Sequence, residues 1–268
     1  MSAVDQVFTE LREENRKAFI PFITAGDPDL EFTAAVIKEL AACGSNICEV
    51  GIPYSDPIAD GPVIQASYTR ALQKHIKLQD ILGAMQQVSG EVSTPLVTMA
   101  SYAIIHRHGL QKYVEDAQAA GIAGAIVPDL LVEESEQFAA ICEKADFSLI
   151  QLVTPTTPRE RAIRIANTST GFLYYVSITG ITGERTSLPA QLTDNVDWLR
   201  EQTALPICIG FGISQPEHVT QLTSVADGVI VGSAFVRRIA DLETKTRAAV
   251  VSELGDHAKR LISALNSA

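Results

Sequence analysis

Eight apolar segments rich in β-branched residues recur along the chain, and this recurrence constrains the fold more than any other feature. They span residues 18–26, 46–54, 94–102, 124–130, 147–155, 171–180, 205–214 and 227–236. Most are near-continuous hydrophobic runs, which are typical of strands buried on both faces of a parallel sheet.

Stretches with helical periodicity separate these segments. We expect helices over residues 30–43, 110–120, 133–144, 159–167, 195–202, 216–224 and 248–265. Two further amphipathic stretches, 4–16 and 64–73, predict one helix before the first strand and one after an extended loop at 55–62.

The alternation of strands and helices predicts βα units that build a parallel sheet. Eight strands in 268 residues give about 33 residues per unit, as in a (β/α)8 barrel. We therefore predict an α/β fold with one (β/α)8 barrel domain over residues 1–268, closed at its bottom by helix 4–16. The alternative is a doubly wound open sheet, but its G-x-G-x-x-G motif is missing after the first strand.

The charge balance of the chain limits the kinds of molecule that it can bind. Acidic residues outnumber basic ones by 32 to 21, giving a net charge of −11. This balance argues against nucleic acids and anionic membrane surfaces, yet backbone amides can still bind one small phosphate group. The densest basic stretches are interpreted as solvated helix charges: Arg159, Arg161, Arg164, and the pair Arg237 and Arg238.

The cysteines and the N-terminal stretch bear on localisation. Cys43, Cys48, Cys142 and Cys208 form no C-x-x-C pair, so we interpret them as small buried hydrophobes in a reducing compartment. The acidic stretch 1–17 has no apolar signal region, and no apolar run approaches the ~20 residues of a membrane span. We expect a cytoplasmic protein.

Active sites of (β/α)8 barrels lie at the carboxyl ends of the strands, where Glu49 is the sharpest candidate. It stands among apolar residues on a predicted buried strand, either as a structural carboxylate paired with a cation or as an acid/base group with a raised pKa. The loop after it carries Asp56, Asp60 and three prolines. These aspartates suit tight turns, but a second carboxylate near Glu49 also allows two acid/base roles in one site.

The sequence lacks the residues that two other kinds of catalytic site would need. None of the eight lysines lies at the carboxyl end of a predicted strand, where a Schiff-base aldolase needs one. His106 and His108 lie in the expected loop after the third strand without a third ligand nearby, so no metal site is predicted.

Glycines mark the ends of the last strands. Gly210 and Gly212 end the seventh segment, and Gly232 with Ser233 ends the eighth and opens a short helix at 234–239. Loops at these places form the recurrent phosphate site of the barrel, and residues 180–183 can add another backbone donor. The residues thus predict an enzyme that acts on a small phosphate ester.

Five motifs carry a resemblance to a known family: PFITAGDP at 21–28, EVGIPYSDPIADGP at 49–62, VSITGITG at 176–183, GFGIS at 210–214 and DGVIVGS at 227–233. The chain resembles the tryptophan synthase alpha chain family through nearly its whole length. The resemblance implies a lyase of tryptophan biosynthesis that cleaves indole-3-glycerol phosphate to indole and glyceraldehyde 3-phosphate in a retro-aldol reaction.

The resemblance also implies roles for single residues. Glu49 would protonate indole C3 and then take the proton of the glycerol hydroxyl, Asp60 would hold the indole N–H, and Tyr174 would lie near the acid. The implied substrate-binding residues are Phe22, Tyr102, Thr182, Gly183, Phe211, Gly212, Gly232 and Ser233. Segment 180–189 matches the family's mobile lid.

No cofactor is expected in this chain. The resemblance implies a partner, a β chain that carries pyridoxal phosphate, in an α2β2 heterotetramer, with Asp56 at the interface. Two loops depart from the family pattern: residues 102–109 lack its Asn and Pro, and Leu131 replaces a proline. We therefore expect weaker association than the family norm. The alternatives are a stand-alone lyase that releases free indole and a catalytically weak partner subunit.

Overall fold

The computed structural model describes residues 1–57, 60–177, 190–210 and 212–267. Within them, parallel strands form one sheet in the order β5-β4-β3-β2-β1-β9-β8-β7-β6. The strands are β1 (Ala18–Thr24), β2 (Cys48–Gly51), β3 (Leu96–Met99), β4 (Ile122–Ile126), β5 (Ser148–Ile150), β6 (Leu152–Val153), β7 (Leu173–Val176), β8 (Ile207–Gly210) and β9 (Gly228–Val231).

The sheet closes because β5 and β6 are two halves of one strand, separated only by Gln151. The first half pairs with β4 and the second with β7. The carbonyl of Gln151 accepts a hydrogen bond from the Tyr174 N–H at 3.1 Å, so the backbone turns from one neighbour to the other at this residue. The predicted eight-stranded barrel is confirmed, with its fifth strand interrupted.

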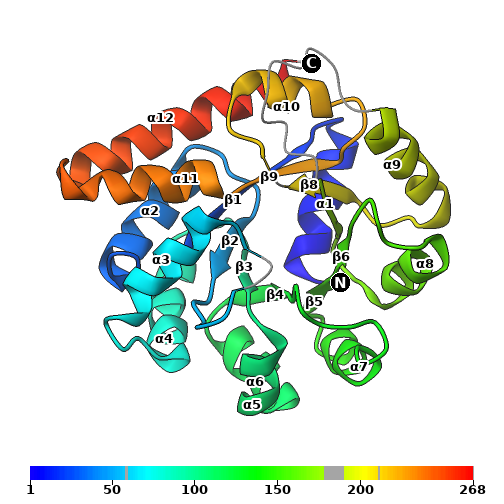
Figure 1. Ribbon diagram of the computed structural model, residues 1–268, viewed down its shortest axis with the longest axis horizontal. Coiled ribbons are helices and arrows are strands. Elements are labelled where there is room, and N and C mark those ends of the chain that lie inside the picture. The colour runs from blue at the N-terminus through cyan, green and yellow to red at the C-terminus, as the bar shows by residue number, and fades with distance from the viewer. Residues whose placement is uncertain (58–59, 178–189, 211, 268) are drawn as a thin grey trace.

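Helices surround the barrel (Figure 1). They are α2 (Leu30–Ala42), α3 (Pro62–Leu72), α4 (Leu78–Ser89), α5 (Tyr102–His108), α6 (Leu110–Ala119), α7 (Glu136–Lys144), α8 (Arg159–Thr168), α9 (Ala190–Gln202), α10 (Pro216–Leu222), α11 (Ser233–Ile239) and α12 (Arg247–Asn266), with a 3-10 turn at Ala240–Glu243. None of the helices within the described ranges is long and apolar enough to cross a membrane.

Three helical predictions were incomplete or wrong. Helix α4 was not expected, and α9 begins five residues before its predicted start at 195. The segment after β3 was expected as a loop but forms α5, capped by Ser101, whose hydroxyl accepts a hydrogen bond from the Ala103 N–H at 3.2 Å. Without the family's proline nothing restricts the preceding backbone to extended conformations, and basic side chains at the end of α5 suit the helix dipole.

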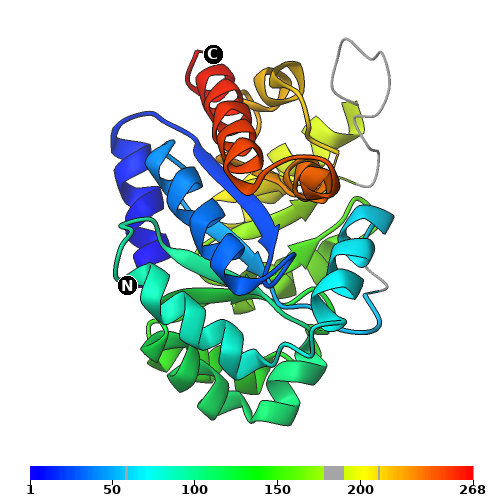
Figure 2. The same ribbon diagram turned by 90° about the vertical axis from the view of Figure 1, so that its left-hand side faces the viewer.

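The barrel interior and the bottom of the barrel share one apolar cluster. Helix α1 (Ala3–Glu13) inserts Val4, Phe8 and Leu11 among the inward-facing strand residues. The ring of Phe8 lies 5.6 Å from the ring of Phe172. Figure 2 shows α1 at the end of the barrel opposite to α3. The N-terminal helix therefore closes the bottom, as predicted, and leaves the carboxyl ends of the strands as the open mouth.

Candidate active site

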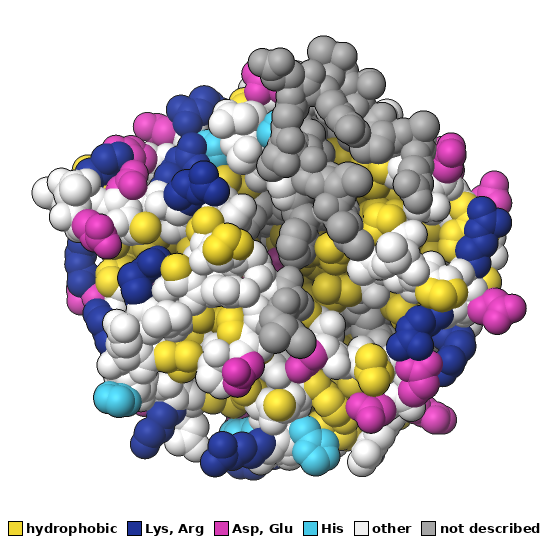
Figure 3. All heavy atoms as spheres, in the orientation of Figure 1, with side chains coloured by type: hydrophobic (Ala, Val, Ile, Leu, Met, Phe, Trp, Pro, Cys, Tyr) yellow, Lys and Arg dark blue, Asp and Glu magenta, His cyan; other side chains and the backbone are white. Residues whose placement is uncertain are grey.

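A cavity of about 220 Å³ lies at the mouth of the barrel. Its walls combine apolar side chains with a few polar groups, the usual composition of a ligand site. In Figure 3 hydrophobic side chains gather near the middle of this face, while most charged side chains lie at its rim. The lining residues are Phe22, Glu49, Asp60, Gly61, Pro62, Val63, Ile64, Met99, Tyr174, Gly212, Ile230, Gly232, Ser233 and Arg237.

Strand β2 places Glu49 inside the barrel. Its neighbours Cys48 and Val50 pack outward against the helices, and a strand alternates its faces, so Glu49 points inward. The side chain is fully buried, and neither carboxyl oxygen has a hydrogen-bond partner among the described residues. The described residues therefore include no cation that pairs with Glu49, as a purely structural carboxylate would require.

Burial, and next to it the negative charge of Asp60, raise the pKa of Glu49 to about 8. A carboxyl group with this pKa keeps its proton at neutral pH and can donate it to a substrate. The isolation of Glu49 is thus the property that a general acid requires.

Asp60 lies on the loop between β2 and α3 and is only partly buried. The Tyr54 hydroxyl donates a long hydrogen bond of 3.5 Å to its Oδ2 atom, and the Gln65 side-chain amide donates to its backbone carbonyl at 2.8 Å. Burial raises the pKa of Asp60 to about 6, and the bond from Tyr54 lowers it. At neutral pH the site therefore combines a protonated Glu49 with an ionised Asp60.

Tyr174 comes from β7 and faces the same interior. Its hydroxyl lies against Gly210, where a Cβ atom would come within 2.3 Å of it, so only glycine fits beneath the ring. Burial raises the pKa of Tyr174 well above its ordinary value, and the carboxyl groups of Glu49 and Asp60 add to this effect. Tyr174 therefore stays a neutral phenol close to both carboxyl groups.

The glycines at the ends of β8 and β9 lie on the cavity wall. Gly212 has a φ of 78°, and Gly232 is the cap of α11, which begins at Ser233. Arg237, one turn further along α11, is an exposed helix charge, as predicted, but it also lines the same cavity, which was not predicted. Its spacing of four residues from Ser233 was the available signal, because residues i and i+4 share a helix face.

Two predicted site residues are not on the cavity wall. Tyr102 opens α5, where its backbone N–H donates to Asp129 Oδ1 at 2.7 Å. Asp56 is exposed in the loop after β2 and accepts a hydrogen bond from the Ser55 hydroxyl at 2.6 Å. Thr182, Gly183, Phe211 and the segment 180–189 lie outside the described residues.

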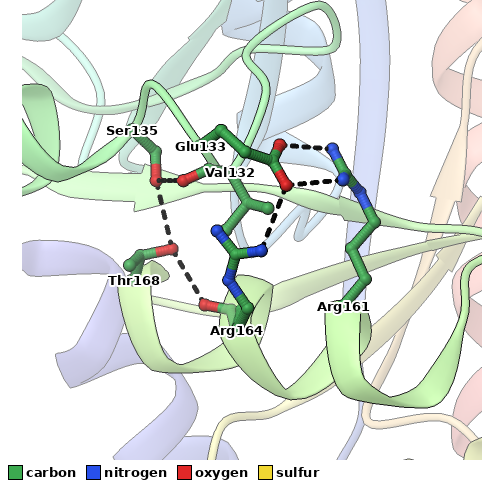
Figure 4. Close-up of polar contacts among 6 residues, drawn as sticks. All are labelled: Val132, Glu133, Ser135, Arg161, Arg164 and Thr168. Carbon is green, nitrogen blue, oxygen red and sulfur yellow. Dashed lines mark hydrogen bonds and ion pairs between the residues drawn. The ribbon is translucent and has the colours of Figure 1, made fainter.

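The remaining charged candidates do not line the cavity. Within the described ranges no group of three potential ligands could hold a metal ion, and His108 Nε2 instead lies 2.7 Å from Asp116 Oδ2. Arg161 and Arg164 both bind Glu133 beyond the end of β4 (Figure 4). Arg164 is exposed and Arg161 is half-exposed, as expected of solvated helix charges, and both also pair with a carboxylate.

A family described as tryptophan synthase alpha chain matches residues 8–264. The chain belongs to the tryptophan synthase alpha chain family. It is 55% identical to the tryptophan synthase alpha chain of Rhodopirellula baltica over the whole of both chains, and 46% identical to that of Rippkaea orientalis over 90% of this chain and 91% of the relative.

Solved structures of this family have the same fold. The alpha chain from Legionella pneumophila subsp. pneumophila has a TM-score of 0.90 at 32% identity, covering 100% of this chain and 98% of that one. A chain of tryptophan synthase from M. tuberculosis has a TM-score of 0.86 at 29% identity, covering 99% and 100%. The family resemblance read from the motifs is thus confirmed, together with the barrel.

Proposed function

We propose that Glu49 and Asp60 carry out the reaction in this cavity, as general acid/base and as electrostatic partner of the substrate. The activity is the α reaction of tryptophan biosynthesis, in which a lyase cleaves indole-3-glycerol phosphate. The observation that carries the residue assignment is a fully buried Glu49, without a hydrogen-bond partner among the described residues, in the same cavity as a partly buried Asp60.

The reaction begins with the proton that Glu49 holds at neutral pH. Glu49 donates it to indole C3, which leaves a positive charge on the ring and a carboxylate on Glu49. The carboxylate then removes the proton of the glycerol hydroxyl next to C3. The C–C bond breaks, its electrons return to the ring, and a carbonyl forms on the leaving fragment. Glu49 ends protonated, and the products are indole and glyceraldehyde 3-phosphate.

Asp60 acts on the other side of the ring. As an anion above its pKa of about 6, it accepts a hydrogen bond from the indole N–H and offsets the charge that forms after protonation. Tyr174 is a neutral donor near the two carboxyl groups, and Phe22 supports the flat face of the ring. The resemblance adds Phe211 to the residues that contact the indole, whereas Tyr102 is left out of this proposal because it does not line the cavity.

The phosphate group binds at the ends of β8 and β9 in this proposal. Backbone amides at Gly212, Gly232 and Ser233 hold its oxygens, and Thr182 and Gly183 add further contacts. Such a site needs no cofactor in this chain. It tolerates the net negative charge of the protein because the donors are backbone groups.

The family implies a β-chain partner. We propose that this β chain carries pyridoxal phosphate, receives the indole, and forms an α2β2 assembly in the cytoplasm, where the four free thiols stay reduced. The exposed Asp56 and Leu131, which is 52% exposed, lie on loops at the mouth and are suited to this contact. The comparisons do not favour a stand-alone lyase.

The test is an assay of indole formation from indole-3-glycerol phosphate, with and without a β chain. Glu49→Gln keeps the shape but cannot transfer the proton, so we expect a loss of about 10²–10⁴-fold in kcat with unchanged binding of glycerol 3-phosphate. A Glu49→Gln variant with nearly normal kcat would refute the assignment. Full activity that no β chain alters would refute the partnership.

A further inference from the structure

Tyr68 on α3 carries a buried hydroxyl that the fold does not use. The residue is 1% exposed, and its hydroxyl has no hydrogen-bond partner among the described residues. A buried polar group left unpaired destabilises the folded state, so most such groups are paired. Phenylalanine would fill the same space without this cost, and the hydroxyl therefore needs another explanation.

The Tyr68 hydroxyl lies close to strand β2 near the active-site cavity. A Cβ atom on Gly51 would come within 2.9 Å of it, and Gly51 is on the same face of β2 as Glu49. Tyr68 belongs to the same buried cluster as Phe22, which lines the cavity, and the centroid of its ring lies 5.5 Å from that of Tyr54. The Tyr68 hydroxyl therefore lies on the side of β2 that carries Glu49, and its ring lies next to Tyr54, the side chain that bonds Asp60.

Asp60 has capacity for another hydrogen bond. The only side-chain bond described for its carboxylate is the one from Tyr54, which at 3.5 Å is at the limit of a hydrogen bond. The neighbouring Glu49 is a poorer acceptor because it holds its own proton. The anion is the group that gains most from a phenol donor, because hydrogen bonds to charged groups are shorter and stronger than neutral ones.

We propose that Tyr68 is a positioning residue for Asp60: its hydroxyl donates a hydrogen bond to the Asp60 carboxylate when substrate fills the cavity. The bond holds the carboxylate toward the indole N–H and keeps it ionised after the ring has displaced water. Burial, followed by the negative charge of Asp60, raises the pKa of Tyr68 well above its ordinary value, so the phenol keeps the proton it donates. This inference rests on the proposed role of Asp60.

Tyr68→Phe tests the proposal because stability and activity should change differently. We expect urea unfolding at pH 7 to give equal or greater stability than the native protein, since an unpaired buried hydroxyl is removed. We expect kcat for indole formation to fall about ten- to a hundredfold, the effect of one hydrogen bond to a charged group. The acid limb of the kcat profile should move to higher pH, while that of kcat/KM, which reports the free enzyme, should stay.

Tyr113→Phe is the matched control. Tyr113 is also fully buried, but its hydroxyl is bonded to Thr98 at 2.7 Å and it does not line the cavity. This variant should lose stability and keep both kcat and its pH profile.

Asp60→Asn separates the two proposals. If it retains normal kcat, the role of Asp60 itself is wrong. If it is inactive while Tyr68→Phe keeps the native kcat and acid limb, the Tyr68 proposal alone is overturned. A fall in the kcat of Tyr68→Phe without movement of the acid limb would also overturn it, because altered packing alone then explains the loss.

Discussion

Replacing Glu49 with glutamine should stabilise the protein while it stops the reaction. The carboxyl group has an ordinary pKa of 4.5 when the chain is unfolded and about 8 when it is buried in the barrel. Below pH 4.5 both states hold the proton, so burial carries no electrostatic penalty. As pH rises toward 8, the unfolded state ionises and the folded state does not, so stability is progressively lost.

The size of this loss follows from the two pKa values. One pKa unit corresponds to about 1.36 kcal/mol, so the gap between 4.5 and about 8 amounts to about 5 kcal/mol, of which about 3 kcal/mol is reached at pH 7. Above pH 8 both states are ionised and the penalty stays constant. Glutamine does not titrate and avoids the whole pH-dependent part.

Urea unfolding of both proteins measures this difference. We expect the free energy of unfolding of Glu49→Gln, minus that of the native protein, to grow by about 4 kcal/mol between pH 5 and pH 8. The pH-independent effect of the new amide cancels in this comparison. A difference that stays flat over this range would show that Glu49 is ionised at neutral pH, and it could then not be the acid that protonates indole.

Three further predictions concern the phosphate end and the partner surface. Gly232→Val should be as stable as the native protein, since a Cβ atom there would lie an ordinary 3.5 Å from Phe22, but it should not bind glycerol 3-phosphate in calorimetry. Gly212→Val should lose both binding and stability, because the φ of Gly212 is 78°. Retained binding in both would place the phosphate elsewhere. Arg237→Gln should raise KM several-fold and weaken its salt dependence at constant kcat; an unaltered KM would exclude a role for this charge. Asp56→Ala should require more β chain for half-maximal activation in a titration, and an identical curve would remove Asp56 from the interface.

The barrel could be predicted because its signals are local. A near-continuous apolar run such as Ala18–Thr24 identifies a doubly buried strand wherever it occurs, and the βα period follows from chain length. The interruption at Gln151 depends on which neighbour each half of the strand pairs with, a property of barrel closure. Helix α5 was missed because its sequence resembled a loop that the family builds differently.

The candidate site, like the fold, could be predicted from the sequence only in part. The motif around Glu49 indicated an acid, but its residues could not separate a catalytic group from a structural ion pair. The deciding properties are the lack of a described partner cation and the proximity of Asp60, both of which exist only in the folded chain. Tyr68 was missed for the same reason, because the surroundings of a helical side chain are set only by packing. Arg237, by contrast, had a signal in the sequence, its spacing of four residues from Ser233.

The fold gives the two carboxyl groups different pKa values because it buries them to different depths. Glu49 is on a strand inside the barrel, and Asp60 is on a loop at its mouth, so burial raises the first pKa to about 8 and the second to about 6. The negative charge of Asp60 also opposes the ionisation of Glu49, which keeps the two protons from being lost together. In the proposed mechanism, cleavage needs an acid at C3 and an anion at the ring nitrogen at the same moment. Only between these two pKa values does the site hold both, and the barrel sets that interval around neutral pH by placing one carboxyl group deeper than the other.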